Sequence, residues 1–280
     1  MKIGFVGAGK LGNSLGEYFF YKNLTVIGYI SKNKKNSREA AYRTKSRYFE
    51  NLSDLVAECD IIFITVPDAE IKNIWEQIKS FNIKDKIICH CSGAMVSSVF
   101  YDIESTGAFS YSVHPFMSIN NKDSYRKFEN AIFTVEGSKE KIQYIENLLK
   151  KLGNRVQVID TKNKVIYHAS AVFSSNFLVP IMYIAIELAK VSGFNNIEAI
   201  FSIAEVTLEN IKKDIVKAVT GPVERNDIET IKSHLDFIEN NDYKKIYLLM
   251  SKKLIDICRV KNIEIDYTEL ENFIIKENEK

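Results

Sequence analysis

The first 160 residues alternate short extended segments with segments of helical periodicity, and no other feature limits the possible folds as strongly. Seven runs are rich in β-branched or aromatic residues: KIGFV, LTVIGYI, DIIFITV, KIICHC, AFSYSV, NAIFTV and RVQVI. Between these runs, apolar residues recur at intervals of three and four, as at Ile71, Ile74, Trp75 and Ile78. Strands that alternate with helices form βαβ units. We therefore predict an α/β fold with a doubly wound, parallel sheet of the Rossmann type.

The sequence after residue 160 has a helical pattern for most of its length, interrupted chiefly at residues 192–196 and 220–227. Five of the twelve glycines fall within Gly4–Gly16, whereas only Gly193 and Gly221 lie beyond Gly153. At 280 residues the chain exceeds the usual single-domain length of roughly 100 to 200 residues. We predict an α/β domain over residues 1–160 and an all-α domain over residues 161–280.

Composition and charge exclude several classes of protein. With 46% hydrophobic and 26% charged residues the chain is neither disordered nor fibrous, and a net charge of +2 gives no general attraction to nucleic acid or to a membrane. No apolar run approaches the roughly 18 residues of a membrane span and no signal region is found, so we expect a cytoplasmic protein. Four cysteines without metal-ligand spacing are expected to be reduced thiols, and no metal is predicted: Cys59, Cys89, Cys91 and Cys258.

The first chemical motif is GAGKLG, which places Gly7, Gly9 and Gly12 in the GxGxxG spacing. It follows the predicted strand at residues 2–6 and opens a predicted helix. Gly7 suits a tight turn, Gly9 the close approach of a pyrophosphate, and Gly12 close packing of the helix. A glycine-rich turn without a ligand is the alternative. The strand–turn–helix context favours a dinucleotide-binding site in residues 1–160.

The segment SKNKK follows the second predicted strand, residues 25–30, and indicates which dinucleotide binds. An NAD site usually has Asp or Glu there for the ribose hydroxyls. Here Ser31 can donate to a 2′-phosphate and Lys32, Lys34 or Lys35 can neutralise it. A solvated basic loop without a ligand role is the alternative. The sequence favours NADP.

Three further loops follow predicted strands, where ligands of doubly wound sheets bind. They are Val66–Asp68, Ser92–Ala94 and His114–Phe116. His114 could donate to a substrate oxygen or merely cap a turn. We interpret His90 as a buried core residue and His234 as solvated.

The predicted cofactor-binding residues are Gly7, Ala8, Gly9, Lys10, Leu11, Gly12, Ser31, Lys32, Lys34, Val66, Pro67, Asp68, Ser92 and Gly93.

The segment YHASAVFSSNF, residues 167–177, brings polar and small residues into a predicted helix that begins near residue 163. At 100° per residue, His168, Ala171, Val172 and Ser175 share one stripe, and Asn176 flanks it. Such a slim face can lie against a nicotinamide ring at the edge of the sheet. It suits a tight helix crossing in a core or a dimer interface equally well.

The segment TGPVERND, residues 220–227, interrupts the helical second half. It could bind a substrate carboxylate through a hydroxyl, a backbone N–H or a bidentate guanidinium. It could also be a helix stop followed by an N-cap at Asn226 or Asp227. The candidate substrate-binding residues are Thr220, Gly221, Pro222 and Arg225.

Together, the motifs GAGKLG, VPD, HCSGA, VHPF, YHASAVFSSNFLV and TGPVERND resemble the Rossmann-like proteins whose C-terminal half is the domain of unknown function 2520. This family is similar to pyrroline-5-carboxylate reductases and to the β-hydroxyacid and 6-phosphogluconate dehydrogenases. The resemblance implies NADP binding, a helical C-terminal domain and a homodimer built from that domain. It implies no particular substrate.

One departure from these relatives concerns the catalytic helix. In β-hydroxyacid dehydrogenases it carries a lysine followed four residues later by asparagine, whereas here His168 is followed by Val172. Lys164 and Asn176 flank His168 without restoring that pattern. The lysine–asparagine pair is therefore missing at this position, and the resemblance does not identify the general acid.

Our hypothesis from the sequence is an NADP-dependent oxidoreductase acting on a small carbonyl or imine compound that carries a carboxylate. His168 or His114 is the candidate acid, with Ser92, Ser175 and Asn176 as orienting groups. An NADP-binding sensor without turnover is the alternative.

Overall fold

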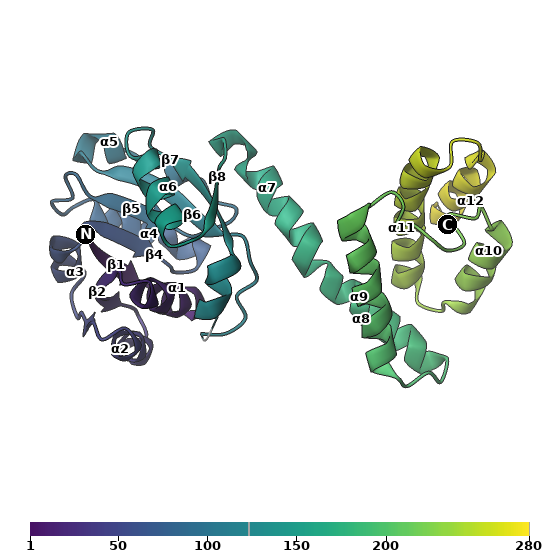
Figure 1. Ribbon diagram of the computed structural model, residues 1–280, viewed down its shortest axis with the longest axis horizontal. Coiled ribbons are helices and arrows are strands. Elements are labelled where there is room, and N and C mark those ends of the chain that lie inside the picture. The colour runs from purple at the N-terminus through teal and green to yellow at the C-terminus, as the bar shows by residue number, and fades with distance from the viewer. Residues whose placement is uncertain (123, 280) are drawn as a thin grey trace. The chain divides into compact units, whose positions relative to one another are not determined.

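The computed structural model describes residues 1–122 and 124–279 of the chain. They form two compact units, Met1–Asn176 and Phe177–Lys280 (Figure 1). The first unit ends after a helix that packs on the sheet, whereas the sequence pattern changes from mixed to helical at residue 160. The predicted division at residue 160 stays a prediction.

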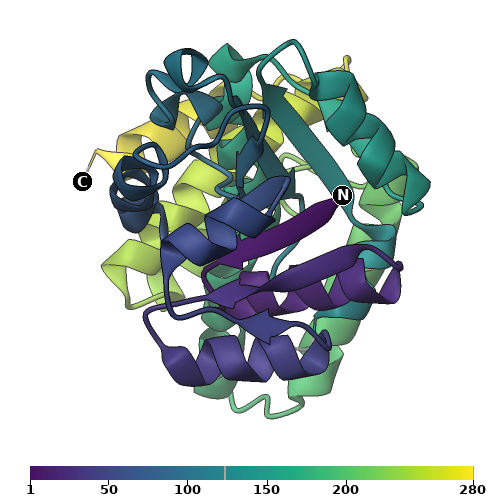
Figure 2. The same cartoon turned by 90° about the vertical axis from the view of Figure 1, so that its left-hand side faces the viewer.

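The first unit is built on one eight-stranded sheet (Figure 2). Its order is β3-β2-β1-β4-β5-β6-β7-β8. Each of the seven extended runs forms a strand, so the Rossmann-type α/β fold is confirmed. In chain order the strands are β1 (Lys2–Val6), β2 (Thr25–Ile30), β3 (Arg47–Tyr48), β4 (Ile61–Ile64), β5 (Ile87–His90), β6 (Phe109–Pro115), β7 (Ile132–Gly137) and β8 (Arg155–Val158).

Two features of this sheet differ from the prediction. β3 has two residues, too few to show a pattern in the sequence. β7 pairs with β6 in the antiparallel direction, whereas every other neighbouring pair in the sheet is parallel, as predicted. In the residues that the structure describes, the connection from β6 to β7 contains a 3₁₀ segment at Tyr125–Asn130 and no α-helix. The chain therefore enters β7 at the same end of the sheet at which it left β6. A parallel crossover would instead carry it back to the opposite end of the strands.

Helices cover both faces of the sheet because successive strand residues point to opposite sides. In β4, Ile61 and Phe63 belong to the core under α1 and α6, whereas Ile62 and Ile64 belong to the core under α3 and α4. The helices of this unit are α1 (Lys10–Tyr21), α2 (Lys34–Arg43), α3 (Leu52–Glu58), α4 (Asp68–Ile78), α5 (Ile103–Thr106), α6 (Ile142–Lys151) and α7 (Lys164–Ala171), the last followed by a π-helical turn (Val172–Asn176).

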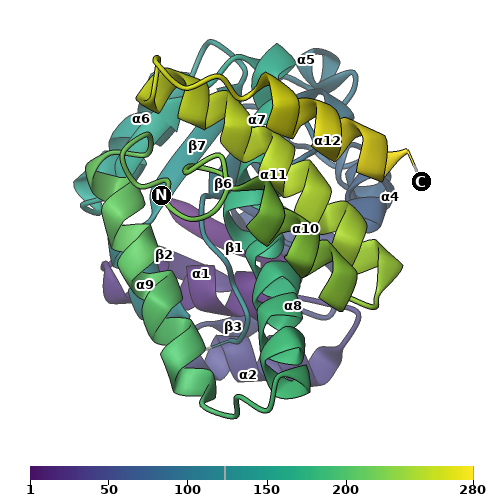
Figure 3. The same ribbon diagram turned by 90° about the vertical axis from the view of Figure 1, so that its right-hand side faces the viewer.

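The second unit is entirely helical in its described part (Figure 3). Its core joins α10, α11 and α12 around residues such as Ile231, Ile255 and Leu270. By contrast, α8 and α9 contain no buried residue, and many of their large apolar side chains are exposed. The helices are α8 (Leu178–Val191), α9 (Ile197–Lys213), α10 (Ile228–Phe237), α11 (Asn241–Lys261) and α12 (Thr268–Asn278).

The expectation that no segment is long and apolar enough to span a membrane is wrong. In the described chain one helical stretch, Thr161–Val191, passes that test with a mean hydropathy of 1.7 over its most apolar window, and 0% of that window is buried. Serine, asparagine and alanine interrupt its apolar residues without adding charge. A single helix of this kind is weak evidence for a membrane protein.

Candidate functional site

The GAGKLG turn lies at the carboxyl edge of the sheet, between the ends of β2 and β4. The backbone N–H of Gly7 donates to the carbonyl of Ile30 at 2.8 Å, and the hydroxyl of Thr65 donates to the carbonyl of Gly7 at 2.8 Å. The turn, the segment after β2 and the segment after β4 are thereby held together.

The three glycines of the motif meet different surroundings. Gly7 has a φ of +107°, and a Cβ there would lie 2.7 Å from the Thr65 backbone. A Cβ on Gly12 would lie 2.3 Å from the carbonyl oxygen of Gly7. A Cβ on Gly9 would meet nothing within 4 Å. Gly7 and Gly12 are therefore required by the fold itself, whereas Gly9 leaves open space beside the first turn of α1, which has no acidic residue.

The SKNKK segment is exposed at the start of α2. Asn33 caps this helix by accepting from the backbone N–H groups of Lys35 and Asn36, and the hydroxyl of Ser31 accepts from the N–H of Asn33. Lys34 lies 3.9 Å from the carboxylate of Glu50, with both side chains about two-thirds exposed. An exposed ion pair of this kind contributes little stability, so the lysine is available to an anion.

One face of the sheet carries a polar row across β5, β6 and β7. His90 pairs in register with Ser112, and Ser112 with Glu136. All three side chains are buried on the face where neighbouring strands carry the isoleucines of the α3–α4 core. Polar groups at such positions are costly unless they are hydrogen-bonded, so a partner must cover them.

Ser112, the middle member of this row, is paired with Lys164, the first residue of α7. The side chain of Lys164 is 0% exposed and its ammonium donates to the hydroxyl of Ser112. Burial lowers the pKa of Lys164, and the nearby carboxylate of Glu136 opposes that shift. Ser112 in turn donates to the carbonyl of Ser92 at 3.3 Å.

Glu136 fixes the segments on either side of the polar row. Its carboxylate accepts from the N–H and the hydroxyl of Ser97, at 2.7 and 2.8 Å, and from the hydroxyl of Thr161 at 2.9 Å. Thr161 lies just before α7, so this carboxylate helps to place the helix that carries Lys164.

His114 and His168 meet above the carboxyl end of β6. Their ring centroids lie 6.1 Å apart at 81°. Gly93 fits between them, because a Cβ there would lie 2.4 Å from Nδ1 of His168 and 3.0 Å from Nε2 of His114. The pKa of His114 falls to about 3, mainly through burial and then through the charge of Lys164. His114 is therefore a neutral imidazole at physiological pH.

A cavity of about 330 Å³ opens beside these two histidines. Among the described residues that line it, none is acidic. The π-helical turn widens the helix here and brings Ser174 to the cavity in place of Val172, which the straight-helix spacing had predicted. Such turns occur often at functional sites. The lining residues are His114, Phe116, Met117, Ser118, His168, Ala171, Ser174, Ser175 and Asn176.

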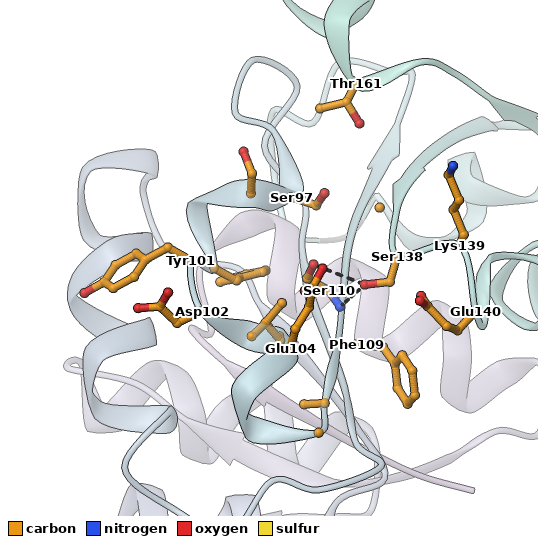
Figure 4. Close-up of a pocket in the computed structure, with 16 residues that line it drawn as sticks. Ser97, Tyr101, Asp102, Glu104, Phe109, Ser110, Ser138, Lys139, Glu140 and Thr161 are labelled. Atoms are coloured by element: carbon orange, nitrogen blue, oxygen red, sulfur yellow. Dashed lines mark hydrogen bonds between the residues drawn. The ribbon is translucent and has the colours of Figure 1, made fainter.

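A larger cavity, of about 690 Å³, lies at the start of β6, toward the opposite edge of the sheet (Figure 4). Several of its hydroxyl groups have partners in the protein: the hydroxyl of Ser138 accepts from the N–H of Ser110 at 3.0 Å, and the hydroxyls of Ser97 and Thr161 donate to Glu136. The smaller cavity lies at the carboxyl edge of the sheet, where ligands of doubly wound sheets bind, so it is the better candidate site.

Two family descriptions match the sequence. Residues 1–115 match a Rossmann-like domain, and residues 131–254 match the domain of unknown function DUF2520. The chain joins a Rossmann-like domain to a DUF2520 domain.

Solved structures share this fold over nearly the whole length. A proposed NADP oxidoreductase of Bacteroides fragilis has 21% identity and a TM-score of 0.77, with 91% of this chain and 98% of that chain covered. A reductive aminase of Aspergillus terreus in complex with NADPH has 10% identity and a TM-score of 0.62, with 98% and 92% covered. Pyrroline carboxylate reductase of Plasmodium falciparum with NADP bound has 17% identity and a TM-score of 0.59, with 93% and 97% covered. No curated protein sequence matches significantly.

The structure brings most of the predicted site residues to one edge of this Rossmann-like, DUF2520-containing chain. His114, His168, Ser175 and Asn176 line the small cavity. Ser92 lies beside them and donates to the carboxylate of Asp68 at 2.6 Å. Their catalytic roles stay predictions.

The predicted substrate residues Thr220, Gly221, Pro222 and Arg225 belong to the second unit. Several of their neighbours have structural roles. Asp227 caps α10 by accepting from Thr230, and Glu224 pairs with Lys261 at 2.9 Å. The expected N-cap at Asp227 is thus confirmed, and substrate binding by this segment stays a prediction.

Sequence reasoning missed four residues of the site: Thr134, Glu136, Lys164 and Tyr167. One signal was present, because Lys164 precedes His168 by four residues. That is the spacing of lysine and asparagine in the β-hydroxyacid dehydrogenases, and it puts both side chains on one helix face. The other partners follow from strand register and lie far away in sequence.

The buried His90 makes stability depend on pH. Its pKa is lowered from 6.5 to about 3, chiefly by burial, while its Nδ1 accepts from the N–H of Ser92. Between these values the unfolded chain binds more protons, so stability falls as the pH falls through 6.5. His90→Asn keeps an acceptor and cannot be protonated. Relative to this variant, the wild type should lose up to about 1.4 kcal/mol of unfolding free energy per pH unit below 6.5. Urea unfolding along a pH series measures this, and equal slopes for the two proteins would contradict it.

Proposed function

We propose that this protein is an NADP-dependent oxidoreductase that transfers a hydride to or from a small carbonyl or imine compound. The observation that carries the proposal is the placement of two features at one edge of the sheet. A glycine turn after β1 is open at Gly9, and a small cavity at the carboxyl end of β6 is lined by His114 and His168. The NADP-containing structures that share the fold support the same reading.

The cofactor would be held by the turn and by the segment after β2. The open space at Gly9 and the first turn of α1 suit a pyrophosphate, because unpaired N–H groups there attract an anion. Ser31, Lys32 and Lys34 would take the 2′-phosphate that distinguishes NADP from NAD. When bound, the nicotinamide supplies the hydride, and the protein supplies orientation and proton transfer.

His168 is our candidate proton donor, because it lines the cavity and has Lys164 one turn before it on α7. A substrate carboxylate is supported by the hydroxyl and amide groups of Ser174, Ser175 and Asn176, together with the absence of acidic groups among the described lining residues. Substrate binding by Thr220 and Arg225, in the second unit, is proposed from the sequence alone.

Two glycine variants test the cofactor site. Gly9→Ala should leave folding intact, because the new Cβ meets nothing within 4 Å, yet should weaken NADPH binding by roughly tenfold or more as one or more phosphate hydrogen bonds are lost. Gly12→Ala should instead lower thermal stability, because its Cβ would press on the carbonyl of Gly7. Fluorescence titration and thermal unfolding measure the two effects. If a folded Gly9→Ala variant bound NADPH as tightly as the wild type, this turn would not be the pyrophosphate-binding site.

The same titration with NADH tests the choice of cofactor. Replacing Lys32 and Lys34 together by alanine should reduce the preference for NADPH. Replacing the exposed Lys212 and Lys213 makes the same change in charge elsewhere and should not alter it. Equal affinity of the wild type for NADPH and NADH would contradict the assignment of NADP.

Turnover is tested by NADPH consumption with a panel of 2-oxo acids, aldehydes and cyclic imines. The proposed enzyme consumes NADPH with at least one of them, and His168→Ala reduces kcat by roughly 10²- to 10⁴-fold while NADPH affinity stays within a few-fold. Tight NADPH binding without turnover of any compound would favour an NADP sensor instead.

We also propose a homodimer that covers α8. The helix contains no buried residue, and Leu178, Val179, Ile181 and Tyr183 are exposed on it. Light scattering without detergent should give the mass of a dimer. Val179→Glu should shift it toward monomer, whereas Ile263→Glu, at an exposed position between α11 and α12, should not. A monomeric wild type, or one soluble only in detergent, would exclude this assembly.

A further inference from the structure

A chain of hydroxyl groups holds His114 from the side away from the cavity. The hydroxyl of Thr134 lies 3.0 Å from that of Tyr167, and the hydroxyl of Tyr167 lies 2.8 Å from Nδ1 of His114. Among the described residues, the Thr134 hydroxyl has one further acceptor within reach, the carbonyl of His114 itself, at 3.4 Å. The geometry makes Thr134 the donor to Tyr167, and Nδ1 of His114 is then the acceptor available to the Tyr167 proton.

This direction determines where His114 carries its own proton. A neutral imidazole has one donor and one acceptor nitrogen, so a ring that accepts at Nδ1 donates at Nε2. His114 lines the cavity, and its Nε2 is the atom that approaches Gly93 on the loop after β5.

We propose that Thr134 and Tyr167 are positioning residues that keep His114 as a neutral Nε2–H donor, and that this donor selects a carbonyl over an iminium substrate. The inference rests on the proposed oxidoreductase function and names the substrate class of the same site.

The preference follows from the charge that develops on each substrate. Hydride addition to a carbonyl carbon moves the π electron pair onto oxygen, and the resulting alkoxide is stabilised by a hydrogen-bond donor and by nearby positive charge. Lys164 is close enough to lower the pKa of His114 electrostatically. An iminium nitrogen has no lone pair to accept from Nε2–H, and its positive charge finds no carboxylate among the described lining residues.

The reaction balances with one further proton. A bound reduced nicotinamide would supply the hydride to the carbonyl carbon and leave as the oxidised cofactor, and a proton would convert the alkoxide into the alcohol. His114 donates a hydrogen bond in this scheme and keeps its proton, so the proton comes from another group, for which His168 is the candidate at the cavity.

The tautomer can be measured without any substrate. In protein labelled with ¹⁵N in its histidine rings, the two ring nitrogens of a neutral imidazole give distinct chemical shifts, and His114→Gln identifies the signals of residue 114. We expect the Nε2–H form in the wild type, a mixture of forms in Tyr167→Phe, and no change in Tyr42→Phe, whose side chain is exposed. An Nδ1–H form in the wild type would overturn the inference.

Kinetics separate a hydrogen-bond donor from a proton donor. His114→Ala should lower kcat for a carbonyl substrate by roughly 10²- to 10³-fold. His114→Gln, whose amide N–H also donates, should recover at least about tenfold of that loss, and Tyr167→Phe should cost about tenfold, the equivalent of one neutral hydrogen bond. Equal losses in His114→Ala and His114→Gln would show that residue 114 delivers a proton and would overturn the proposal.

The substrate panel distinguishes the failure of this inference from that of the proposed function. Reduction of carbonyl compounds with little reduction of cyclic imines supports both. Reduction of imines alone overturns the carbonyl preference and leaves the oxidoreductase function standing. Inertness toward both classes overturns the proposed function together with the substrate class, and the nitrogen shifts still decide the tautomer.

Discussion

The arrangement of the candidate site depends on the buried ammonium group of Lys164. On the face of the sheet that α3 and α4 cover, β5, β6 and β7 carry the polar side chains of His90, Ser112 and Glu136 in register. In most doubly wound sheets these positions are apolar. Lys164 at the start of α7 donates to Ser112, the middle member of this row, whereas Ser97 and Thr161 donate to Glu136 and the N–H of Ser92 donates to His90. Moving α7 would leave the buried ammonium group without its hydrogen-bond partner. The helix is therefore held in one position along the strands, and one turn later this position brings His168 over the end of β6.

Burial also determines the protonation state of two histidines near Lys164, which nevertheless have different roles. Burial and the charge of Lys164 keep His90 and His114 neutral, so neither is an acid at physiological pH. His90 is enclosed in the core, whereas His114 reaches the cavity and is oriented by Tyr167. Burial and the charge of Lys164 thus keep both imidazoles neutral, and only His114 has access to the cavity.

The sequence predicts those features of this protein that depend on interactions between residues close together in the chain. The GAGKLG turn, the seven longer strands and the cap at Asp227 depend on residues close to one another in the chain, and all are found. The direction of β7 and the role of Lys164 depend on distant partners: the lysine binds Ser112 across 52 positions. The π-helical turn also escaped prediction, because a stripe drawn at 100° per residue assumes an unbroken helix and so included Val172. A buried polar row cannot be recognised until strand register places its members side by side.

Gly93 has a consequence for how related sequences can vary. Its missing side chain leaves room for the imidazoles of His168 and His114, which come from two other segments of the chain. Any larger residue at 93 would need a smaller or differently turned side chain at one of the other two positions. The three positions should therefore be coupled in substitution: a change at 93 that is damaging alone should become tolerable when 168 or 114 has already lost its ring, and double-mutant cycles would show this as non-additivity.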